Sequence, residues 1–259
     1  MQIIVEARKN AAVDALYQKV EAQTPITLKA IAGCTWSSAT KAGVTEIEVG
    51  TALHPEAALY HELLHADLKI SGLTLPPFAV SKNPNSIGIS DTLYAIENEL
   101  QHHRMFGAFT AAGFSPAHFY DDDDHAAFKK IRQTLDAIAP SAAPTSFLML
   151  LLTIIAPGGK NSDADRQTLK KTFYSRCSGG TRAKMEKIEG VFKAWTASPS
   201  LDTKPPIIQI LNILGEYDGT WIGGGTPSPS NGEQTAAIGV SSAVHERHAR
   251  QNPTKYVDP

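Results

Sequence analysis

Residues 44–70 read VTEIEVGTALHPEAALYHELLHADLKI, and this stretch carries the clearest structural signals of the chain. Its first part, Thr45 to Val49, alternates polar and apolar residues, as a half-buried β-strand does. Pro55 suits the first turn of a helix, so we expect a helix from about His54 to Ile70. The stretch therefore predicts a strand followed by a helix, and this helix carries the sequence HELLH at positions 61–65.

The two histidines of HELLH lie four residues apart, so on a helix their side chains point the same way, one turn apart. Two imidazoles in that arrangement can bind one Zn²⁺. Glu62 is turned about 100° around the helix axis from His61, so it is poorly placed as a ligand but can reach a water on the metal. The sequence therefore predicts His61 and His65 as zinc ligands and Glu62 as the catalytic base.

A catalytic zinc needs a third protein ligand. The metzincin spacing HExxHxxGxxH fails in this chain, because Leu68 and Ser71 replace its glycine and its last histidine. The next source is a helix expected from Asp91 to about Ala112, which contains the sequence IENELQHHRMF at positions 96–106. We therefore expect the third ligand to come from this second helix.

Asn98 and Glu99, together with HELLH, resemble the gluzincins, the thermolysin-like branch of the zincin metallopeptidases. The resemblance covers about residues 45–110 and implies that Glu99 is the third zinc ligand. In that family an acid follows four residues later, whereas this chain has His103. Glu97 is a rival ligand that is turned about 200° from Glu99 on the helix, so one of the two at most faces the metal.

Helix phase favours Glu99 over Glu97, because Glu99 shares a flank with the apolar residues Ile96 and Phe106. Asp91 is a more distant choice, since an N-cap role suits it better.

Further polar side chains near the predicted ligands are candidates for a part in catalysis. His102 and His103 can donate a hydrogen bond to a tetrahedral intermediate or support the ligands, and His103 is the stronger catalytic candidate of the two. Tyr60 and Tyr94 are possible oxyanion donors, but tyrosines at such positions more often serve packing.

Composition narrows the class of protein. The chain has 259 residues, a net charge of −2 and a pI of about 6.5, so nothing in it calls for a nucleic acid or an acidic membrane as partner. Its two cysteines are too far apart in sequence for a CxxC metal pair, and we expect both to be thiols. The apolar run at positions 147–156 has about half the length of a membrane span. Without a recognisable signal peptide, we expect a cytoplasmic protein.

The expected fold class is α+β and zincin-like. A small twisted N-terminal sheet, with further strands at Ile3 to Ala7 and Ile26 to Ala32, packs on the HELLH helix, and the second half is mostly helical. We divide the chain into a metal-binding domain at 1–140, a helical region at 141–222 and a flexible polar tail at 223–259.

These patterns predict a zinc-dependent peptidase that acts on a peptide or protein substrate. The strand at Thr45 to Val49 is expected to hold an extended substrate by edge pairing. One rival is a zinc-containing binding or sensor protein without turnover, with the helical half as its partner-binding part. Another rival is a helical scaffold that holds no metal. The substrate and the oligomeric state are left open by the sequence.

Overall fold

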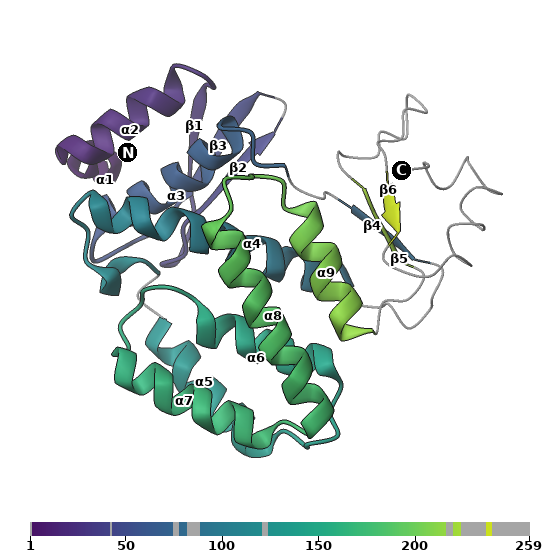
Figure 1. The fold of residues 1–259 in the computed structure, drawn as a ribbon. Helices are drawn as coiled ribbons and strands as arrows, with labels where there is room; N and C mark the ends of the chain where they lie inside the picture. The colour runs from purple at the N-terminus through teal and green to yellow at the C-terminus, as the bar shows by residue number, and fades with distance from the viewer. Residues whose placement is uncertain are drawn as a thin grey trace. The chain divides into compact units, whose positions relative to one another are not determined.

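The structure is a computed structural model that describes residues 2–41, 43–74, 78–81, 89–120, 124–215, 220–223 and 237–239 (Figure 1). The fold class is α+β, as expected, with a small mixed sheet and mostly helices. The chain divides into two compact units. Unit 1 comprises Met1–Leu73, Gln101–Ile138 and Ile154–Phe173, and unit 2 comprises Thr74–Leu100, Ala139–Thr153 and Tyr174–Pro259.

The secondary-structure elements follow in chain order. The helices are α1 (Gln2–Ala7), α2 (Ala11–Glu21), α3 (Pro55–Ile70), α4 (Ile89–Ala111), the 3₁₀ helix η1 (Pro116–His118), α5 (Asp124–Ala137), α6 (Pro144–Ile155), α7 (Asp163–Arg176), α8 (Gly179–Ala197) and α9 (Lys204–Leu214). The strands are β1 (Ile26–Ala30), β2 (Ser37–Lys41), β3 (Val44–Val49), β4 (Phe78–Ser81), β5 (Thr220–Gly223) and β6 (Ala237–Gly239).

The sheet of unit 1 has the order β1-β3-β2, with β3 parallel to β1 and antiparallel to β2. Alternate side chains of β3, namely Thr45, Ile47 and Val49, are buried, which confirms the expected strand. Because β3 is the central strand, its backbone is already paired on both sides. The expectation that an extended substrate pairs with this strand is therefore wrong.

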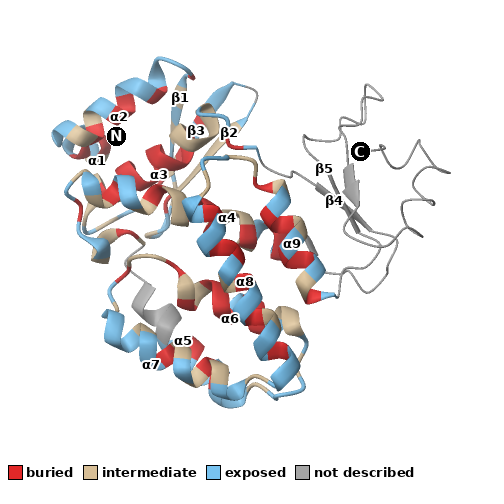
Figure 2. Ribbon diagram, in the orientation of Figure 1, coloured by how far each residue is buried: buried red, intermediate tan, exposed pale blue. Residues whose placement is uncertain are grey.

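Helix α3 has the bounds that the sequence predicted, with Pro55 in its first turn and Gly72 just past its end at a φ of 99°. A left-handed backbone at that place suits glycine and stops the helix. Helices α1 and α2 and strand β2 pack against α3. Leu59 and Leu63 of α3 are fully buried there, so the HELLH helix lies in the core of unit 1 (Figure 2).

The first expected strand is instead helix α1, so this prediction is wrong. In a strand, Ile3, Val5 and Ala7 would share one face. In the structure Val5 is 56% exposed, whereas Ile4 and Ala7 are buried, which is the three-residue spacing of a helix. A short apolar run does not by itself distinguish the two periods.

Unit 2 contains a second sheet, of order β4-β5-β6 with both pairings antiparallel. Strand β4 lies in a segment for which the sequence predicted no strand, and β6 lies within the predicted polar tail. The rest of that tail, 224–236 and 240–259, falls outside the described residues.

Helix α6 contains the most apolar run of the sequence. Phe147, Leu148 and Leu151 are fully buried, so the run serves as a core helix. Among the described residues, no helix is long and apolar enough to cross a membrane.

Cys34 and Cys177 are both thiols, as expected.

Candidate metal centre

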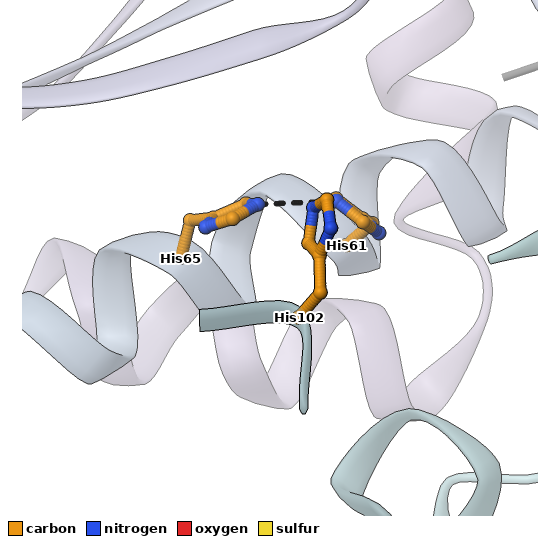
Figure 3. Close-up of side chains that lie close together, drawn as sticks. All are labelled: His61, His65 and His102. Atoms are coloured by element: carbon orange, nitrogen blue, oxygen red, sulfur yellow. Dashed lines mark hydrogen bonds between the residues drawn. The ribbon is translucent and has the colours of Figure 1, made fainter. Parts of the chain in front are cut away.

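Three buried histidines of unit 1 come together in space. His61 and His65 lie one turn apart on α3, and His102 approaches from the second half of α4 (Figure 3). Their ligand nitrogens all lie within 4.8 Å of one another. Each residue is 8% exposed or less. A buried group of this kind can hold a metal ion.

The spacing within the pair on α3 suits a shared ion. The Nε2 atoms of His61 and His65 lie 3.1 Å apart. Two nitrogens bound at 2.0–2.1 Å to one tetrahedral Zn²⁺ are separated by about 3.4 Å, so little movement would be needed. Three imidazoles are also a known protein ligand set of catalytic zinc sites, in which the fourth position stays open for water or substrate.

Gln101 fixes the orientation of one of these rings. Nδ1 of His65 lies 2.9 Å from Oε1 of Gln101. An amide oxygen can only accept, so Nδ1 carries the proton and Nε2 keeps its lone pair. The ring nitrogen that faces His61 is therefore the one that is ready to bind a metal, and Gln101 acts as the outer partner that such ligands usually have.

Burial keeps these histidines neutral. It lowers the pKa of His65 and of His102 from 6.5 to about 3, and the neighbouring His102 ring adds to the effect at His65. Burial also lowers the pKa of His61 well below 6.5, with contributions from His65 and His102. A metal ligand must be deprotonated, so all three rings are in the form that binds a metal at neutral pH.

A pH dependence of stability follows for the metal-free protein. Below about pH 6.5 the unfolded chain protonates these histidines while the folded chain does not, so stability falls as the pH drops from about 6.5 toward 3. Each histidine contributes up to about 1.4 kcal/mol per pH unit in that window. Urea unfolding of chelator-treated protein at several pH values measures the slope. Replacing His102 by Gln should make the dependence of stability on pH shallower. An unchanged dependence would contradict the lowered pKa of His102.

Aromatic side chains after α4 cover the histidines. The ring of Phe119 lies 4.7 Å from that of His61 and 5.6 Å from that of His102, centre to centre. The ring of Tyr120 lies 5.1 Å from His102 and 6.4 Å from His61, and its hydroxyl oxygen is buried. Sequence reasoning missed both residues. They reach the site through the turn at Gly113, whose φ is 90°, and no sequence pattern indicates that path.

The predicted catalytic base lies on the same helix as two of the histidines. Glu62 directly follows His61 and is buried. Its backbone carbonyl accepts a hydrogen bond of 3.0 Å from Oγ of Ser38, which ties α3 to β2.

The histidine group contains His102 from α4 and not Glu99, the ligand that the sequence resemblance implied. Glu99 lies three residues before His102 and is buried, whereas Glu97 and His103 are half-buried and Asp91 is exposed. The roles of Glu99 and His103 stay predictions.

Of the two tyrosines considered, Tyr60 packs against Phe109 and Phe114 in the core. Tyr94 is 71% exposed.

Comparison with known proteins gives no match: no protein family, curated protein or solved structure resembles the chain significantly.

Proposed function

We propose that this protein is a zinc-dependent peptidase of the HExxH, zincin-like type. The observation that carries the proposal is the buried group of three neutral imidazoles, two from HELLH and one from α4. The glutamate inside HELLH supports an enzyme over a purely structural site, which more often has four protein ligands. His61, His65 and His102 would hold the zinc.

When bound, zinc supplies a Lewis acid that polarises the scissile carbonyl and makes the attacking water more acidic. The carboxylate of Glu62 accepts the proton of that water and then passes it to the leaving amine. Gln101 holds the ring of His65 in place. The ring of Tyr120 lies next to that of His102, and its hydroxyl is a candidate donor to the oxyanion that develops on the carbonyl oxygen.

An extended peptide substrate would pair with a strand that has an open edge, and β3 has none because it is the central strand. Strand β2 is paired with β3 on one side, and the Ser38 hydrogen bond holds it against α3, the helix of Glu62. In the described part of the chain, no strand pairs with the other side of β2. We therefore assign substrate pairing to the outer edge of β2.

The proposal is tested with purified protein and a library of fluorescence-quenched peptides. We expect cleavage that a chelator such as 1,10-phenanthroline abolishes and that added Zn²⁺ restores, because the proposed reaction needs the metal that His61, His65 and His102 would hold. Cleavage that persists in metal-free protein would contradict the proposal.

A second candidate function is a zinc-binding protein without turnover. The observation that favours it is the low exposure of the three histidines, between 6% and 8%, because a substrate carbonyl has to reach the metal. Such a protein would bind zinc through the same residues and cleave no peptide of the library.

A further inference from the structure

Unit 2 carries a groove on the hairpin of helices α8 and α9, which pack against each other. The groove has a volume of about 740 Å³, within the range of about 300–1,000 Å³ that ligand pockets usually have. It is lined by Lys184, Lys187, Pro205, Ile208, Gln209, Asn212 and Ile213.

The α9 side of the groove combines apolar and amide groups. Ile208 and Ile213 are half-buried, so part of each side chain remains available for contact. Gln209 and Asn212 are exposed and lie three residues apart, on neighbouring positions of the helix surface. Primary amides both donate and accept hydrogen bonds, which suits a peptide backbone. This side therefore fits an apolar side chain together with the main chain beside it.

The α8 side of the groove is cationic. Lys184 and Lys187 line it, and none of the described residues that line the groove is acidic. Lys184 donates a hydrogen bond of 2.5 Å to the carbonyl of Leu214 at the end of α9, so its position is fixed. Lys187 is exposed and has no ion pair among the described residues.

The acidic residues of α8 do not neutralise this charge, because they pair with other cations. Glu186 forms an ion pair of 2.8 Å with Arg182, and Glu189 forms one of 2.8 Å with Lys193. The charge of Lys187 therefore remains available to a ligand.

We propose that this groove binds an acidic peptide segment of another protein. An apolar side chain of the peptide lies between Ile208 and Ile213, the amides of Gln209 and Asn212 contact its backbone, and a flanking carboxylate pairs with Lys187. Charge complementarity selects the occupant, since the residues that the structure describes in the lining supply two ammonium groups and no carboxylate. A net charge of −2 and a cationic side of two lysines favour a peptide over a nucleic acid.

Fluorescence anisotropy with short labelled peptides tests this binding. The probes are pentapeptides with leucine at positions two and four, flanked by Asp and Glu, by Gln, or by Lys, together with a single-stranded oligonucleotide. We expect the parent protein to bind the acidic peptide at least tenfold more tightly than the glutamine and lysine peptides. Lys187→Glu should weaken that binding at least tenfold, because a like charge then faces the carboxylate. Ile208→Ser should also weaken it.

Lys171→Glu is the matched control. This lysine is exposed on α7 and does not line the groove, and the acidic peptide should bind this variant within twofold of the parent. No binding of the acidic peptide up to millimolar concentration, equal binding of the lysine peptide or the oligonucleotide, or an equal loss in Lys171→Glu would each overturn the proposal. The assay needs no zinc, so its outcome is independent of the proposed peptidase.

Discussion

Glu62→Gln should abolish peptide cleavage and leave the zinc in place. The amide has the shape of the carboxylate but cannot accept the proton of the attacking water. Loss of a general base typically costs about 10²–10⁴-fold in rate. The three proposed ligands are histidines, so metal content should stay that of the parent. Steady-state cleavage rates and zinc content, measured on the same preparation, provide the test.

Glu56→Gln is the control for this variant, because it makes the same chemical change in the first turn of the same helix. Its glutamate has no proposed part in catalysis, so its cleavage rate should match that of the parent. If Glu62→Gln cleaves at the parent rate while zinc is bound, Glu62 is not the base.

His102→Ala should lose most of the bound zinc. Loss of a residue that hydrogen-bonds to a metal ligand typically lowers metal affinity by about 10–100-fold. Loss of a ligand itself should lower the zinc affinity by more than that. His65→Ala should behave in the same way, since two remaining histidines hold Zn²⁺ far less tightly than three. Each variant is dialysed against a mild chelator, and its zinc is then counted by elemental analysis.

His103→Ala is the matched control, because it removes the neighbouring imidazole of the same helix and should keep its zinc. Glu99→Ala decides between the two candidate third ligands. If Glu99→Ala empties the site and His102→Ala does not, Glu99 is the third ligand, as the gluzincin resemblance implies. If Glu97→Ala alone among the α4 variants empties it, the phase assigned to this helix is wrong.

The sequence predicted α3 well because several local signals agree there. A half-buried strand precedes it, Pro55 occupies its first turn, and Gly72 follows its end. The two histidines of HELLH then meet through helix geometry alone, without any knowledge of tertiary structure. This part of the site could be predicted because it depends on one element.

The third histidine could not be chosen from the sequence, because it depends on how α4 approaches α3. On a helix His102 lies about 60° to one side of Glu99, and His103 lies about 40° to the other side. Both therefore share the flank of Glu99, and helix phase does not separate them. Burial in the folded protein separates the two residues, because His102 is buried whereas His103 is half-buried.

Strands β2 and β4 were missed for a related reason. Strand β2 reads SSATK, with little of the apolar alternation that marks a strand, and it exists because β3 supplies its hydrogen bonds. Strand β4 follows two prolines and pairs with β5, about 140 residues later in the chain. Strand formation at such places depends on distant partners rather than on local pattern.

An anomalous X-ray map at the zinc absorption edge, from crystals of the purified protein, shows directly whether the three histidines bind zinc. If His61, His65 and His102 hold the zinc, the map shows one strong peak about 2.0–2.1 Å from a ring nitrogen of each of them. Zinc-loaded crystals whose map shows no peak among these three rings would contradict it.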